Sequence, residues 1–393
     1  MTAADSSTRL QDLLQAVLAG RDQPLEQAAT LPPGAYASEA FYQLEVERVL
    51  RPAWLPVGHV AQLARVGDYF CHDLCGEMLL VMRGSERLRV LSRVCLHRWA
   101  ELLQGSGNCR RFACPAHKWT YDLDGRLIGA PAMDQVAFDP RQQRLPEYRS
   151  EIVDGFIYVN LSGDAPALAP QLQELSRELQ PLAPEHWRIG ATLEYDCPVN
   201  WKLIVETFSE CYHHIGAHPE TFDATYPGRD SYVEEGRTAW TVLHAPARRD
   251  VPQDRLTAGF PLLGPLTAQQ RQEFRVYLIY PYQLLAVMPD RVYWFCLQPG
   301  AAMRTRFQAH LLLDPRALED PNYSGLIEAE RSFYVRFNDE DIAINRMQQR
   351  GVATGAARTG RFSHLEKALW QFANYLRQRL DTRTPRARIE VAR

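Results

Sequence analysis

The sequence has no long apolar run, and none of its apolar segments approaches the roughly 20 residues that a membrane-spanning helix needs. Its N-terminus, Met1-Thr2-Ala3-Ala4-Asp5, lacks the basic segment and the apolar core of a secretory signal peptide. Eight cysteines in 393 residues are too few for a disulfide scaffold. These three absences predict a cytoplasmic protein with reduced thiols and no membrane contact.

An excess of charge of one sign is also missing. The chain has 44 Lys and Arg against 47 Asp and Glu, so its net charge is -3, and the two signs are interspersed. Because nucleic-acid-binding domains usually present a strongly basic face, we expect no nucleic-acid partner. A composition of 46% hydrophobic and 23% charged residues is typical of a globular protein, and the length predicts two or three domains.

The pattern of apolar residues divides the chain into three segments. Residues 10–19 have helical periodicity, and we expect residues 1–45 to form a helical segment that packs on the C-terminal domain. Residues 46–164 hold short apolar stretches separated by turns, such as 78–82 and 156–159, which predicts an all-β domain. Residues 165–393 hold strands followed by long helical patterns. The predicted fold class is therefore α+β.

Two short pairs of metal-ligand residues lie in the predicted β domain. Cys95 and His97 are separated by one residue, and Cys114 and His117 by two. A Rieske [2Fe–2S] cluster takes two Cys on one iron and two His on the other, which is the set that these pairs offer. A structural zinc site could use the same four residues, as could an ordinary core without metal. Zinc pairs usually combine Cys-x-x-Cys with His-x-x-x-His, so the cluster is the favoured interpretation.

A second group of ligand residues begins at Glu210-Cys211-Tyr212-His213. If the helix expected from about residue 201 continues, Glu206, Glu210 and His213 share one face, because they lie four and three residues apart. A break at Gly216 would let His218 turn back toward His213. Two histidines of this kind can hold a mononuclear metal.

Two histidines with one carboxylate form the facial triad of non-haem Fe(II) oxygenases. The carboxylate must come from elsewhere, and Asp339 and Asp341 begin a helical run far along the chain. They lie two residues apart and point to roughly opposite sides of a helix, so only one of them can be a ligand. The spacing alone leaves both open. His214 is expected to face solvent or to support the ligands.

The chain resembles the large (α) subunits of Rieske-type non-haem iron oxygenases. The matching residues are Cys95-Leu96-His97-Arg98, then Cys114-Pro115-Ala116-His117-Lys118-Trp119, then Asp124-Gly125-Arg126-Leu127. The sequence departs from the family pattern at two places. Trp99 stands where the family usually has Gly, and Ala116 stands where it usually has Tyr.

The resemblance implies a Rieske domain followed by a helix-grip catalytic domain. It assigns the [2Fe–2S] cluster to the two Cys/His pairs and a mononuclear Fe(II) to His213, His218 and Asp341. Asp341 is preferred over Asp339 because its distance from Gln349-Arg350-Gly351 fits the family register better. Glu210 and Asn200 are the candidate catalytic residues.

The resemblance also implies an activity and partners. The chain would be a terminal oxygenase that activates O₂, receives electrons from a separate NAD(P)H-dependent reductase, with or without a ferredoxin, and forms a head-to-tail homotrimer. No Gly-rich dinucleotide fingerprint follows a predicted strand, which agrees with a separate reductase. In this family an acidic residue at the position of Glu210 bridges the Rieske histidine of one subunit to the iron histidine of the next.

The substrate expectation rests on the type of that acidic residue. Glu rather than Asp at position 210 resembles the group that acts on choline, glycine betaine and carnitine, so hydroxylation or N-demethylation of a small amine ranks first. Hydroxylation of an aromatic or natural product is the alternative, and a Rieske electron carrier without catalytic iron is the alternative of another class. Six aromatic residues could form a cage for an ammonium group or simply fill the core. They are Trp240, Tyr277, Tyr280, Tyr282, Tyr293 and Trp294.

Overall fold

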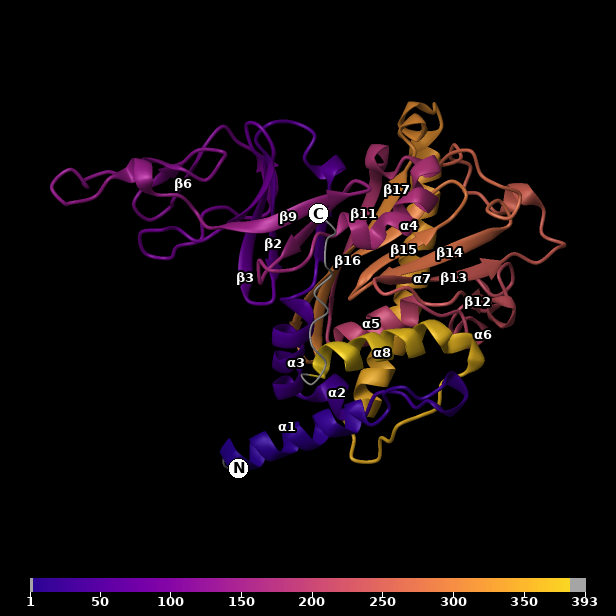
Figure 1. Cartoon of the computed structure of the whole chain (residues 1–393). Helices are drawn as coiled ribbons and strands as arrows, with labels where there is room; N and C mark the ends of the chain where they lie inside the picture. Colours follow the sequence, from indigo (N-terminus) through magenta and orange to yellow (C-terminus); the bar gives the residue numbers. More distant parts are fainter. Residues whose placement is uncertain (1–2, 382–393) are drawn as a thin grey trace.

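The computed structural model describes residues 3–381, so the outer ends of the predicted segments 1–45 and 165–393 lie outside the described residues. The chain forms two seven-stranded antiparallel sheets, a small three-stranded sheet, and a set of helices that pack mainly on the second large sheet (Figure 1). The predicted α+β class is confirmed. No helix among residues 3–381 is both long and apolar enough to cross a membrane.

The N-terminal β domain projects to the left in Figure 1. Its large sheet has the strand order β1-β10-β9-β4-β3-β2-β5, and β6, β7 and β8 form the small sheet. The apolar stretches predicted as strands at 78–82 and 156–159 are the buried strands β3 and β10. The strands are β1 Leu55–His59, β2 Asp68–Leu74, β3 Glu77–Arg83, β4 Leu88–Ser92, β5 Ser106–Asn108, β6 Phe112–Ala113, β7 Thr120–Tyr121, β8 Leu127–Gly129, β9 Glu147–Val153 and β10 Phe156–Asn160.

The second sheet has the order β11-β17-β16-β15-β14-β13-β12, with all neighbouring strands antiparallel. The sequence did not predict β15, because five consecutive buried residues have no alternation that distinguishes a strand from a turn. The strands are β11 Arg188–Cys197, β12 Tyr232–Val233, β13 Trp240–Pro246, β14 Glu273–Ile279, β15 Gln283–Val287, β16 Val292–Ala301 and β17 Arg304–Leu313.

One long helix, α7, packs against β11 and against α5, as a helix-grip domain requires, and α8 runs beside α1 (Figure 1). Helix α2 contacts α7, so the N-terminal segment packs on the domain of the second large sheet. The exact limits of the three predicted segments stay a prediction. The helices are α1 Ala3–Leu18, α2 Gly34–Ala37, α3 Glu39–Glu45, α4 Gln173–Leu179, α5 Trp201–Phe208, α6 His214–Ala217, α7 Tyr323–Val352 and α8 Lys367–Leu380.

Candidate functional site

The two Cys/His loops of the β domain have the same backbone turn. In each loop the fourth residue after the cysteine donates its backbone N–H to the cysteine carbonyl: Trp99 to Cys95 at 3.1 Å, and Lys118 to Cys114 at 3.0 Å. Trp99 and Lys118 also share a positive φ, 59° and 60°. The repeated turn presents one cysteine and one histidine from each loop, so the sequence folds into a two-fold arrangement of ligands.

The four side chains separate into an inner pair of cysteines and an outer pair of histidines. Cys95 and Cys114 are buried, whereas His117 is exposed and its ring lies 4.6 Å from that of His97. Burial opposes ionisation of Cys114, but the backbone N–H groups of Ala116 and His117 outweigh it and hold the pKa of this thiol below its usual value. The thiolate, which is the metal-binding form, is therefore favoured.

These residues fit a two-iron cluster better than a single ion. Nδ1 of His97 is buried without a hydrogen-bond partner, a costly state that a bound metal relieves. A zinc ion would draw all four ligands around one point. Within residues 3–381, however, no three of the four side chains come close enough to share one ion. The structural-zinc alternative is therefore disfavoured.

Tyr121, which the sequence analysis did not single out, lies at this site. Its hydroxyl is 3.3 Å from Sγ of Cys95 and accepts the backbone N–H of Leu96 at 3.1 Å, so its own proton is available to a thiolate at this sulfur. Hydrogen bonds to the sulfurs set the reduction potential of such clusters. Tyr121 is fully buried in β7, and no ligand spacing in the sequence marks it.

At the second site, the prediction that one helix carries Glu206, Glu210 and His213 on one face is wrong. Helix α5 ends at Phe208. The carboxylate of Glu206 accepts a hydrogen bond from Tyr36 at 2.7 Å instead, and burial raises its pKa to about 7. Glu210 and His213 meet in the turn that follows α5, where the backbone N–H of His213 is bound to Oε2 of Glu210 at 3.0 Å.

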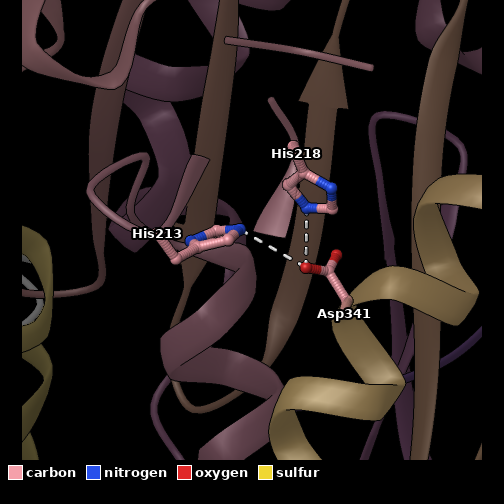
Figure 2. A group of neighbouring side chains, drawn as sticks. All are labelled: His213, His218 and Asp341. Atoms are coloured by element: carbon pink, nitrogen blue, oxygen red, sulfur yellow. Dashed lines mark hydrogen bonds and ion pairs between the residues drawn. The ribbon is translucent and has the colours of Figure 1, made fainter. Parts of the chain in front are cut away.

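Three predicted ligand residues converge in Figure 2. Nε2 of His213 lies 3.3 Å from Oδ1 of Asp341, and Nε2 of His218 lies 2.8 Å from the same oxygen. The three ligand atoms lie within 4.8 Å of one another. Asp339, the alternative, is exposed and does not belong to this group. Helix α7 thus brings one of the two candidate aspartates to the histidines.

Each ligand imidazole is held from behind by a carboxylate. Nδ1 of His213 lies 2.7 Å from Glu210, and Nδ1 of His218 lies 2.7 Å from Glu340. Such outer carboxylates fix the tautomer and orientation of metal-binding histidines. Burial lowers the pKa of His213, but Glu210 and Asp341 outweigh it and raise that pKa to about 10. The site therefore stabilises a positive charge between the rings and Asp341, as Fe(II) would supply.

Glu340 is the second residue of the candidate sites that the sequence analysis did not assign. It accepts hydrogen bonds from Thr221 at 2.8 Å and from Arg336 at 3.3 Å, which orient its carboxylate toward His218. Neighbouring residues on a helix point about 100° apart. Glu340 and Asp341 can therefore contact opposite nitrogens of one imidazole. The signal was available in the acidic run at 339–341.

Two other predicted residues have mainly structural contacts. Asn200 is buried and caps α5: Oδ1 accepts the N–H of Lys202 at 3.0 Å, and Nδ2 donates to the carbonyl of Ala302 at 2.6 Å. Its catalytic role stays a prediction. His214 is buried and does not face solvent, and the centroid of its ring lies 5.0 Å from that of His213. Burial, followed by the nearby histidines, lowers its pKa to about 3, so this ring is neutral.

An apolar cavity adjoins the triad, and its aromatic lining differs from the prediction. Of the six aromatic residues proposed for a cage, only Tyr293 lines the cavity. Trp294, its neighbour in β16, points to the other face of the sheet because side chains alternate along a strand. The aromatic residues that line the cavity are Phe208, Phe222, Phe274, Tyr293 and Phe337.

Comparisons with known proteins agree with these two sites. The family model "Ring hydroxylating alpha subunit (catalytic domain)" matches residues 184–382, and the model "Rieske [2Fe-2S] domain" matches residues 53–149. The carnitine monooxygenase oxygenase subunit of Acinetobacter pittii is 33% identical over 226 residues, which are 56% of this chain and 60% of that protein. The match to the first curated relatives thus spans about 60% of their length.

Longer matches are also found. The glycine betaine monooxygenase oxygenase subunit of Chromohalobacter salexigens is 26% identical over 394 residues, or 91% of this chain and 88% of that protein. A crystal structure of the quaternary ammonium Rieske monooxygenase CntA with L-carnitine superposes with a TM-score of 0.76 at 26% identity, covering 91% of this chain and 97% of that one. The chain belongs to the Rieske oxygenase α-subunit family, whose cofactors are a Rieske [2Fe–2S] cluster and a mononuclear iron.

Proposed function

We propose that this chain is the terminal oxygenase of a system that hydroxylates or oxidatively N-demethylates a small amine or quaternary ammonium compound. One observation carries the proposal: His213, His218 and Asp341 converge at the wall of an apolar cavity that is lined by aromatic side chains. One oxygen atom of O₂ would enter a substrate C–H bond. The other oxygen atom would be reduced to water, using two electrons from the reductase and two protons from solvent.

The residues of the chain divide this work among them. When bound, iron supplies coordination positions where O₂ is reduced, and the cluster supplies electrons. Glu210 and Glu340 hold the Nδ1 atoms of the two histidines, so both Nε2 atoms stay directed at the iron position. The aromatic lining excludes water, which protects reactive oxygen chemistry from side reactions.

The proposal is tested with the purified holoenzyme and a surrogate reductase. We expect about three irons per chain, a Rieske EPR signal, and hydroxylated amine or formaldehyde formed in step with O₂ uptake. A cluster signal without a third iron after anaerobic reconstitution would favour an electron carrier. Products only from aromatic substrates would favour the alternative substrate class.

The same proposal includes a cytoplasmic location, a separate reductase and a head-to-tail trimer. The Cys/His loops next to β6 lie at one end of the molecule and α6 lies at the opposite end (Figure 1). Electrons would have to cross the whole chain to reach its own iron. In a ring of three copies, the exposed His117 of one subunit would face Glu210 of the next. Identical head-to-tail contacts close into such rings.

Exposed apolar side chains at both ends support this assembly. Trp99, in the cluster loop, is 81% exposed, and Ile215 and Tyr212, on either side of the iron site, are 73% and 50% exposed. A bulky residue in the left-handed region costs about 1–2 kcal/mol. Trp99 has that backbone conformation although its side chain is mostly exposed. An anchor that packs on Ile215 of the neighbouring subunit would account for the exposed ring of Trp99.

Replacing Trp99 with Gly should weaken the trimer and leave the subunit intact. Loss of an interface anchor of this kind typically weakens association by 2 kcal/mol or more, roughly thirtyfold, while Gly relieves the strained φ. Sedimentation velocity over a concentration series measures the change, and the cluster absorbance reports the fold. Met303→Ala, which removes another exposed side chain, is the matched control. A trimer equally stable in W99G and M303A would refute the anchor.

A further inference from the structure

Apart from the iron site itself, the cavity beside the triad offers no cationic partner to a substrate. None of the fifteen residues that line it is Lys, Arg, Asn or Gln. The charged lining groups Glu210 and Asp341 and the rings of His213 and His218 belong to the iron site, and the remaining histidine, His214, is neutral. The rest of the lining is aromatic or aliphatic, apart from Thr207, Cys211 and Tyr293.

The two hydroxyl groups that line the cavity already have hydrogen-bond acceptors. The hydroxyl of Thr207 donates to Asn345 at 2.7 Å. The hydroxyl of Tyr293 donates to Glu330. The ring of His214 has its Nδ1 3.4 Å from the carbonyl of Tyr226. A substrate carboxylate would therefore find no free hydroxyl donor on these side chains.

The two arginines that contact residues of the site are paired as well. Arg291 lies behind Tyr293 and is buried, where it donates to Glu330 at 2.8 Å and to Asp290 at 2.6 Å. Arg336 lies on the outer side of α7 and donates to Glu220 at 2.9 Å. Neither guanidinium lines the cavity, so neither can neutralise a bound anion.

Elementary energetics then separates cationic from zwitterionic substrates. An ionised carboxylate that loses its water without gaining donors is strongly disfavoured, whereas an ammonium group over aromatic faces is attracted to them. The ring centroid of Phe222 lies 5.7 Å from that of Phe274 and 5.1 Å from that of Phe337, so the three rings form a continuous aromatic wall. Such a wall is suited to N-methyl groups and gives nothing to a carboxylate.

We infer that the substrate is a small ammonium compound without a carboxylate, such as an alkylammonium or an ammonium alcohol, and that betaines are excluded. The inference rests on the proposed function and deepens it. Carnitine and glycine betaine, after which two relatives are named, both carry a carboxylate. This chain would thus share their reaction and differ in the head group that it accepts.

Three probes of similar size test the inference on the holoenzyme: choline, glycine betaine and 3,3-dimethylbutan-1-ol, the uncharged isostere of choline. We expect choline to bind at least about a hundredfold more tightly than glycine betaine, with the neutral alcohol between them. Equal or tighter binding of glycine betaine would overturn the inference. Binding and oxidation are measured separately. Oxidation of glycine betaine alone would overturn the inference and leave the proposed function standing. Selective binding of choline without oxidation of any probe would overturn the proposed function and leave the binding preference standing.

Two variants locate the effect in the cavity. Phe274→Leu should weaken the binding of choline about tenfold and leave the neutral alcohol nearly unchanged, because only the cation uses the ring face. Phe333→Leu is the matched control, since Phe333 packs behind Phe222 and does not line the cavity. Met288→Arg should reverse the preference by adding a cation to the lining. Equal losses for choline and the alcohol in F274L would contradict the role of the ring.

Discussion

Replacing Asp341 with Ala should reduce the iron content from about three to about two per chain and abolish substrate oxidation. Oδ1 of Asp341 is the one anionic atom that both ligand imidazoles face, at 2.8 and 3.3 Å. Without it, two neutral rings remain as ligands. Even the loss of a residue that only supports a ligand costs ten- to a hundredfold in metal affinity, and the loss of the ligand itself should cost more.

Asp339→Ala is the control for this experiment, because Asp339 lies on the same helix two residues away and is exposed. It should retain all three irons and full activity. Iron analysis together with EPR of the reduced cluster distinguishes loss of the mononuclear iron from general damage. If Asp339→Ala loses the third iron while Asp341→Ala keeps it, the ligand assignment is wrong.

The parts of the two sites that could be predicted are those that the chain brings together locally. Cys95 and His97 lie in one tight loop, so their spacing alone shows that both can bind one cluster. The choice between Asp339 and Asp341 was different. Helical geometry left both open, and only the register of a known family favoured Asp341. The structure then shows the reason, because a rotation of about 200° along α7 separates the two side chains.

The parts that could not be predicted depend on competition between local and distant contacts. The sequence after α5 contains no Gly or Pro before Gly216, so nothing indicated that the helix ends at Phe208. Just beyond Phe208, the Glu210 carboxylate accepts a hydrogen bond from the backbone N–H of His213. This local bond competes with the backbone bond that would continue the helix. Tyr121 reaches Cys95 across 26 positions, and periodicity carries no information about such pairs.

A buried ion pair holds the segment that leads to the iron site. Nζ of Lys202 lies 2.7 Å from Oε1 and 2.9 Å from Oε2 of Glu45, and neither side chain is exposed to solvent. The pair joins α3 to α5, eight positions before Glu210. Burial raises the pKa of Glu45 and lowers that of Lys202, and the charge of each residue opposes the shift in the other. The rings of Tyr36 and Trp201 each lie 5.2 Å from the ammonium.

Lys202→Met should destabilise the catalytic domain by about 3–5 kcal/mol, because it leaves the Glu45 carboxylate buried and unpaired. The urea midpoint of the catalytic-domain transition measures the loss. Lys367→Met removes a cation from an ion pair with Glu235, which is 90% exposed, and should change stability by less than about 1 kcal/mol.

The double variant Glu45→Leu/Lys202→Met separates stability from positioning. Replacing both charges by apolar groups should restore most of the stability, since a buried pair gains little over hydrophobic packing. If iron content and activity return with stability, the pair only supports the fold. If the double variant is stable but binds iron weakly, the pair sets the angle at which α5 delivers Glu210 and His213. If the single variant Lys202→Met were as stable as K367M, the structure of this core would be contradicted. A buried carboxylate without a partner must lower the free energy of unfolding.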